Sequence, residues 1–111
     1  MTVHDDLVYV RHIAGALDKI ASYTQGLTEA EFVASSMIQD AVVRQFEVIG
    51  EATKNISPAF RTLHGELPWP LMAQMRDRLI HHYWDVDASV LWTTVTEDLP
   101  KITLIVSRLL P

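Results

Sequence analysis

The sequence predicts an all-α protein, an antiparallel up-and-down bundle of four to five helices. Apolar residues recur at spacings of three and four in several segments, as on one face of a helix. Capping residues and prolines separate these segments, and no alternating apolar pattern typical of a strand is present. Because 111 residues is the size of one domain, we expect residues 1–111 to form a single compact unit.

The first helix is expected over about residues 5–23, and Gly26 follows it as a stop signal. Thr28 and Glu31 have the spacing of a capping box, which predicts that a short helical turn begins there. The apolar stripe of the first helix comprises Val3, Leu7, Val10, Ala14, Leu17 and Ile20.

The second long helix is the central one, capped by Ser35 or Ser36 and ending before Ser57-Pro58, since proline disfavours a helical residue before it. Gly50 within it costs about 1 kcal/mol relative to alanine. It indicates either the close approach of another helix or a ligand, or a tolerated glycine. The apolar stripe comprises Ile38, Val42, Phe46, Ile49, Ala52 and Ile56.

Residues 57–70 hold three prolines and a glycine, and predict a loop with room for one helical turn. Pro70 suits the first turn of the next helix, which we expect from about Trp69 to His82. Asp85 and Asp87 then serve as turn and N-cap residues.

The last helix has an apolar stripe that Pro100 interrupts. Proline removes one backbone hydrogen bond and clashes with the preceding turn, so we expect a kink near Thr96 or two shorter helices. The stripe comprises Leu91, Val95, Leu99, Ile102, Val106 and Leu109.

Composition excludes several classes of function. The net charge of −5 excludes the global basic field of a constitutive, non-specific nucleic-acid binder. The absence of cysteine excludes disulfides and thiolate metal sites. No apolar run is long enough to span a bilayer and the N-terminus does not resemble an export signal, so we expect a cytoplasmic protein without membrane contact. The hydrophobic fraction of 49% predicts an obligate homodimer, in which a partner covers apolar surface.

Residues 76–83 carry the densest chemistry: two arginines, two histidines and a tyrosine in an acidic chain. On a helix Arg76 and Tyr83 would share a face, whereas His81 would lie about 140° round from Arg76. Either the helix ends near His81, or a second protomer completes the site across a two-fold axis.

These residue types suit RNA cleavage. His81 can act as acid or base, and Asp77, four residues earlier, can fix its tautomer and favour its protonated form. Arg76 can stabilise charge developing on phosphorus, with Arg78 and His82 in support. The alternative is structural: solvated charges, a histidine at the helix C-terminus, and Tyr83 and Trp84 in the core. We expect no metal and no cofactor, since adjacent histidines diverge on a helix and the other histidines lie in separate segments.

The spacing of Arg76, His81 and Tyr83 resembles the R-x4-H-x-Y signature of HepT-type toxins in the HEPN superfamily. Pro68-Trp69 and the sequences "HHYWDVDASVLWTTVTEDLP" and "RQFEVIGEATK" resemble the same family, so that the resemblance covers nearly the whole chain. Here Asp77 follows the arginine, where asparagine is common in the superfamily.

The resemblance implies a HEPN-like helical dimer whose two motif segments face one another across a shared cleft. It implies a metal-independent ribonuclease acting on mRNA or tRNA, with Arg76 and His81 as catalytic residues. Tyr83 corresponds to the tyrosine that an MntA-type minimal nucleotidyltransferase antitoxin (MNT) modifies with AMP. Two alternatives stay open: a non-catalytic nucleotide-binding or adaptor subunit of a nucleotidyltransferase, and a dimeric scaffold without a ligand.

Overall fold

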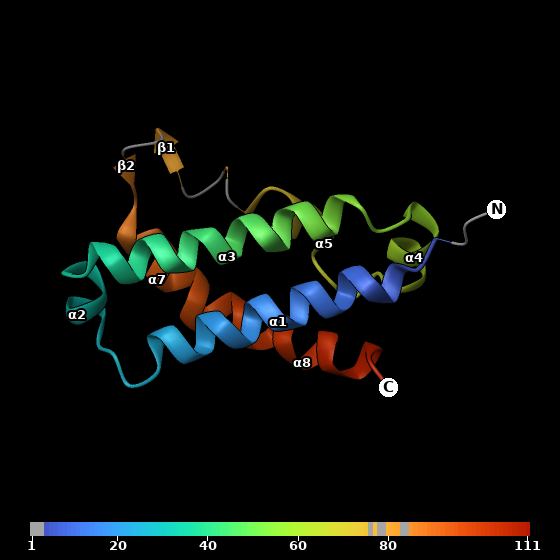
Figure 1. Ribbon diagram of the computed structural model, residues 1–111, viewed down its shortest axis with the longest axis horizontal. Coiled ribbons are helices and arrows are strands. Elements are labelled where there is room, and N and C mark those ends of the chain that lie inside the picture. The colour runs from blue at the N-terminus through green and yellow to red at the C-terminus, as the bar shows by residue number, and fades with distance from the viewer. Residues whose placement is uncertain (1–3, 76, 78–79, 83–84) are drawn as a thin grey trace.

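The computed structural model describes residues 4–75, 77, 80–82 and 85–111, and it is a helical protein with one pair of very short strands (Figure 1). The molecule is elongated, with principal extents of 48 × 28 × 21 Å. Its elements are α1 (Asp6–Thr24), α2 (Glu29–Val33), α3 (Ser36–Lys54), α4 (Pro58–Leu63), α5 (Trp69–Ala73), β1 (Ile80–His82), β2 (Asp85–Val86), α7 (Ala88–Thr93), the π-helix η1 (Thr94–Asp98) and α8 (Leu99–Leu109).

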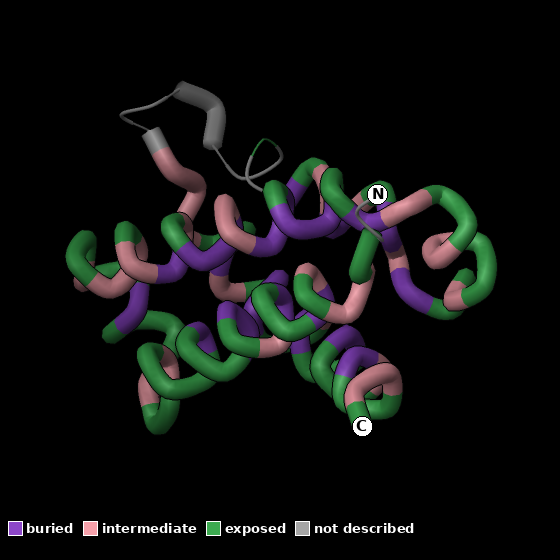
Figure 2. The backbone as a smooth tube through the Cα atoms, turned by 45° about the vertical axis from the view of Figure 1, so that its right-hand side comes forward, coloured by how far each residue is buried: buried purple, intermediate pink, exposed green. Residues whose placement is uncertain are grey.

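The core lies between α1, α3 and the C-terminal helices. Figure 1 shows α1 and α3 side by side and antiparallel, with α8 returning along α1. The buried sides of these helices face one another (Figure 2). This confirms the helical architecture and the predicted stripes, except that Val3 lies outside the described residues. The buried apolar residues from the predicted stripes include Val10, Leu17, Ile20, Val42, Phe46, Ile49, Leu91, Leu99, Ile102 and Val106.

The helices α3 and α7 begin after their predicted capping residues, and α1 begins after Asp5, which was predicted only as the approximate start of that helix. Asp5 caps α1, Ser35 caps α3 and Asp87 caps α7, each through a side-chain oxygen that accepts a backbone N–H. The Thr28 hydroxyl accepts the Glu31 N–H at 3.2 Å, and the Glu31 carboxylate accepts the Thr28 N–H at 2.9 Å, so the capping box is confirmed. These bonds satisfy N–H groups that helix ends leave without intrahelical partners.

The predicted break near Thr96 is confirmed as a π-helix. η1 separates α7 from α8, and Pro100 occupies the first turn of α8, where a missing N–H costs no intrahelical bond. The wider turn therefore admits the proline without ending the packing of this segment against α1.

The helix predicted from Trp69 to His82 is wrong at its end: Met75 and Asp77 are still helical, but Ile80–His82 is a strand. α5 ends at Ala73, and β1 pairs antiparallel with β2, with Ile80 opposite Val86 and His82 opposite Asp85. Isoleucine and histidine have only modest helix propensity, which the ladder overrides. His81 is therefore in a strand and not in a helix, whereas Arg76 lies outside the described residues.

Two contacts hold the loop between α3 and α5. The Ser57 N–H and hydroxyl donate to Asp6 Oδ1 and Oδ2 at 2.7 and 2.8 Å, which ties the start of α4 to the start of α1. The indole N–H of the buried Trp69 donates to the carbonyls of Arg61 and His64 at 3.1 and 3.0 Å. Together they fix where α5 begins.

Candidate active site

The residues predicted to do chemistry lie between α5 and α7. Arg76, Arg78 and Tyr83 fall outside the described residues. His81 and His82 belong to β1, of which the backbone is described. β1 and β2 lie beyond α3, on the side away from α1 (Figure 1). The two strands therefore lie at the edge of the bundle.

Asp77 is exposed and lines a groove of about 300 Å³ between α3 and the chain that follows α5. We call this the α3–α5 groove. Its lining residues are Arg44, Glu47, Gly50, Glu51, Lys54, Ala73 and Asp77. The groove places one predicted site residue next to the central helix.

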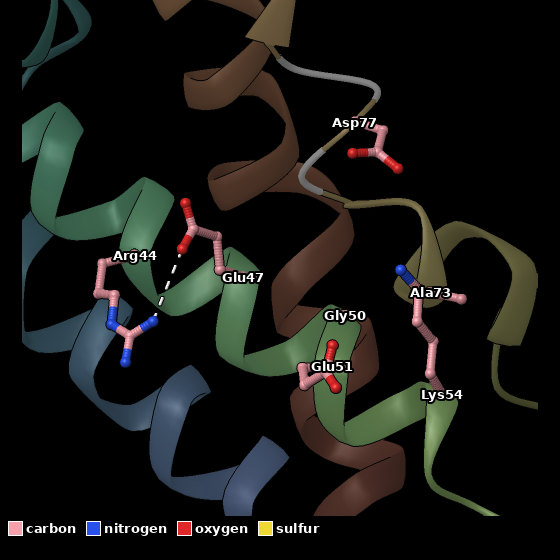
Figure 3. Close-up of a pocket in the computed structure, with 7 residues that line it drawn as sticks. All are labelled: Arg44, Glu47, Gly50, Glu51, Lys54, Ala73 and Asp77. Carbon is pink, nitrogen blue, oxygen red and sulfur yellow. Dashed lines mark ion pairs between the residues drawn. The ribbon is translucent and has the colours of Figure 1, made fainter. Parts of the chain in front are cut away.

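Four charged residues of α3 form one side of this groove, and we call them the charged ridge: Arg44, Glu47, Glu51 and Lys54. Arg44 Nη1 lies 3.6 Å from Glu47 Oε2 in a largely exposed ion pair (Figure 3). Lys54 reaches up from the end of α3 beside Ala73 (Figure 3). The ridge offers cations at both ends and carboxylates between them.

Gly50 sets the spacing of the groove. A β-carbon at this position would lie 3.3 Å from the Ala73 carbonyl oxygen and 3.6 Å from that of Met72. These are backbone atoms, so a side chain at residue 50 would require α3 and α5 to shift apart by a few tenths of an ångström. The predicted close approach of another helix is confirmed.

A second groove, of about 210 Å³, lies between α1 and α3, and we call it the α1–α3 groove. Arg44, Glu47 and Glu51 line both grooves, so the charged ridge lies between them. The lining residues of the α1–α3 groove are Tyr9, His12, Arg44, Glu47, Val48, Glu51, Ala52 and Asn55.

The charged ridge was missed as a site when the sequence was interpreted. Its residues are spaced three, four and three apart, which is the spacing of one helix face, and their charges run from positive through two negatives to positive. This charge pattern is common on exposed helices. It marks a candidate site only because Ala73 and Asp77 line the same groove as these residues.

Two absences concern only the part of the chain that the structure describes. No group of three histidine, aspartate or glutamate side chains there has the geometry to hold a metal ion. No helix there is both long and apolar enough to cross a membrane.

The chain matches the family described as "Ribonuclease HepT-like" over residues 13–109. It belongs to the HepT-like ribonuclease family. The match includes both grooves' α3 residues and the complete R-x4-H-x-Y motif, and confirms the resemblance found in the sequence. Family membership assigns the chain to the ribonucleases.

Individual relatives agree with the HepT-like assignment. The chain is 47% identical over 94 residues to the "Probable ribonuclease HepT" of Thermococcus cleftensis, covering 85% of this chain and 86% of that one. It is 34% identical over 102 residues to a "Putative RNase" of Caldanaerobacter subterraneus, covering 92% and 91%.

A third relative is the "Gamma-glutamylcyclotransferase and putative RNase" of Methanocaldococcus jannaschii, which is 42% identical over 98 residues. The alignment covers 88% of this HepT-like chain and 44% of that longer protein. No solved structure gives a significant match.

Proposed function

We propose that the chain is a metal-independent endoribonuclease toxin of a HEPN/MNT toxin–antitoxin pair, cleaving mRNA or tRNA at a site shared by two protomers. The family match over residues 13–109 carries the proposal, because this range contains Arg76, His81 and Tyr83 at the R-x4-H-x-Y spacing. The open groove beside Asp77 supports it, since an RNA strand needs an accessible polar surface next to the reacting groups.

The reaction needs only protein side chains. A neutral His81 takes the proton of a ribose 2′-OH as that oxygen forms a bond to the adjacent phosphorus. The bond from phosphorus to the 5′-oxygen breaks, and a protonated His81 of the second protomer gives its proton to that oxygen. Arg76 stabilises the charge on the phosphoryl oxygens. The products are a 2′,3′-cyclic phosphate and a 5′-OH end.

Exposed apolar side chains support a homodimer. Val33, Met37 and Val90 are 47%, 78% and 41% exposed, and they lie on α2, the start of α3 and α7, which pack together. These elements form the end of the molecule nearest β2 (Figure 1). A partner bound there would cover apolar surface and bring a second motif segment near the first.

Tyr83 is the proposed off-switch. An MNT-domain antitoxin would transfer AMP from ATP to the tyrosine oxygen with release of pyrophosphate. The added phosphate and adenine would block the cleft and neutralise the guanidinium of Arg76.

Cleavage of a mixed mRNA and tRNA substrate in the presence of EDTA tests the nuclease. We expect cyclic-phosphate ends from the wild type and no cleavage by His81→Ala. His64→Ala, which changes a histidine outside both grooves, should cleave like the wild type. Intact RNA at high concentrations of dimeric, unmodified protein would refute the proposal.

The switch is tested by intact mass after coexpression with the neighbouring nucleotidyltransferase. We expect added AMP groups on the wild type and none on Tyr83→Phe. Unchanged mass of the wild type, with an active partner present, would remove the regulatory part of the proposal and leave the nuclease part standing.

One observation favours a second candidate, a non-catalytic nucleotide-binding or adaptor subunit of a nucleotidyltransferase. The α3–α5 groove contains three carboxylates, from Glu47, Glu51 and Asp77, which repel a polyanion more than a single nucleotide. This candidate predicts that ATP or AMP binds, that Arg76→Ala weakens binding, and that no RNA is cut. Calorimetric titration with AMP, run beside the cleavage assay, separates the two candidates.

A further inference from the structure

Three aromatic rings gather at the start of α1. The imidazole of His4 stacks on Tyr9 with ring centroids 5.6 Å apart and planes 20° apart, and His12 meets Tyr9 edge-on at 5.9 Å. Tyr9 is half-buried and packs against the core, whereas both histidines are exposed. The packing holds the phenol ring in place before any ligand arrives.

The rings adjoin the charged ridge. Tyr9 and His12 line the α1–α3 groove together with Arg44, Glu51 and Asn55. Because Arg44 and Glu51 also line the α3–α5 groove, a strand lying across the ridge can reach from Asp77 to Tyr9. Tyr9 lines the groove and His4 does not, so the stacking of His4 on Tyr9 leaves the part of the ring that faces the groove open to a ligand.

We propose that the α1–α3 groove is a base-binding subsite for single-stranded RNA, which holds a nucleobase of the strand that carries the cleaved phosphate. The proposal rests on the ribonuclease function proposed above. Tyr9 and His12 supply aromatic surface for stacking, and Arg44 supplies a cation for the neighbouring phosphate. Flat rings beside a cationic side chain are how proteins hold unpaired bases.

The polar groups of the groove select a base that donates hydrogen bonds. The Asn55 side-chain amide donates to the Glu51 carbonyl at 2.9 Å, which leaves its Oδ1 as an acceptor. The Glu51 carboxylate accepts only. Guanine presents N1–H and a 2-amino group on one edge, so it pairs with both acceptors where uracil cannot. Carboxylates in an RNA groove thus act as base-reading groups.

Stacking is tested with a 2′-O-methyl oligonucleotide, which cannot be cleaved, carrying the fluorescent base 2-aminopurine at each position in turn. We expect quenching at one position on binding to the wild type. Tyr9→Leu, which keeps an apolar side chain against the core, should abolish that quenching and weaken binding about tenfold. Tyr23→Leu, at the other end of α1 and outside the groove, should match the wild type.

Base selection is tested by replacing guanine with inosine at the quenched position, which removes only the 2-amino group. We expect the wild type to bind guanine about fivefold more tightly. Glu51→Gln should reduce this preference, whereas Asp40→Asn, the same charge change on an exposed residue of α3, should keep it.

The results separate the subsite from the nuclease. The subsite is supported if Tyr9→Leu loses the quenching and Glu51→Gln loses the guanine preference. If these results are found but no RNA is cut, only the proposed nuclease function is refuted. If the wild type cleaves RNA but Tyr9→Leu and Tyr23→Leu show equal quenching, only the subsite proposal is refuted. Absence of binding to every oligonucleotide also overturns it.

Discussion

Gly50 of α3 lies against the carbonyl oxygen of Ala73, the last residue of α5, so closely that a β-carbon at position 50 would sit 3.3 Å from that oxygen. Few β-carbon contacts in proteins are this tight, and the neighbour is backbone rather than a side chain that can rotate. The distance between α3 and α5 therefore depends on the absence of a side chain at position 50. In the sequence, α5 is followed closely by the motif at residues 76–83.

Gly50→Ala should lower kcat for RNA cleavage several-fold. Alanine gains about 1 kcal/mol in helix propensity, but it displaces α5 and with it the start of the motif segment. Gly15→Ala is the matched control, because a β-carbon there meets nothing within 4 Å and should raise the melting temperature without changing kcat. If the two variants are equally active and equally stabilised, the contact has no role in positioning.

Lys54→Ala should weaken RNA binding and reduce its salt dependence. Lys54 lines the α3–α5 groove, and a lysine that contacts a phosphate adds about one unit to the slope of log affinity against log salt. Fluorescence anisotropy at several salt concentrations measures the slope. Lys19→Ala, on α1 and outside both grooves, should keep it, and an unchanged slope in Lys54→Ala would take this residue out of the RNA path.

Met37→Glu should dissociate the proposed homodimer. Its side chain is 78% exposed on α3, and a carboxylate there would be buried without a partner in the interface. Leu63 on α4 is 75% exposed and provides the control Leu63→Glu. Sedimentation equilibrium should find Met37→Glu monomeric and inactive while Leu63→Glu stays dimeric. If both variants have the same oligomeric state, the end formed by α2, α7 and the start of α3 is not the interface.

Asp6 should make stability depend on acidic pH. Burial alone would raise the pKa of Asp6, but hydrogen bonds from Ser57 and the contact with His4, at 3.0 Å, outweigh it and hold the pKa below its usual 3.8. A carboxyl with a lowered pKa contributes stability above about pH 3.8 and loses it as the pH falls through the folded-state pKa.

Urea unfolding of Asp6→Asn between pH 7 and pH 3 measures this contribution. We expect a loss of about 1–2 kcal/mol at neutral pH, shrinking below pH 4 as the wild type protonates. Asp18→Asn, exposed on the same helix, should track the wild type. A deficit that stays constant with pH would mean that the Asp6 charge adds nothing to the link with Ser57.

Local chemistry made much of this fold predictable. A cap depends on residues two or three positions apart, so Thr28 with Glu31 and Ser35 could be identified without knowing the rest of the molecule. Pro100 likewise affects only the turn that precedes it, and the π-helix η1 lies in that turn.

The failures have a common physical origin in contacts between distant segments. Ile80–His82 has an adequate helical spacing, but its backbone pairs with β2 instead, which periodicity does not reveal. The bond from Ser57 to Asp6 spans 51 positions in the chain. Tyr9 and Arg44 line one groove because α1 and α3 pack side by side and antiparallel. The sequence pattern of either helix alone does not predict this groove.

The π-helix between α7 and α8 has a consequence for chain length. A π turn is one residue inserted into an α-helix, so deleting Thr96 would restore the regular repeat while the buried faces of the flanking helices kept their direction. Pro100 would then clash with the turn before it, and the deletion would be tolerated only together with Pro100→Ala. The extra residue thus makes room for the proline.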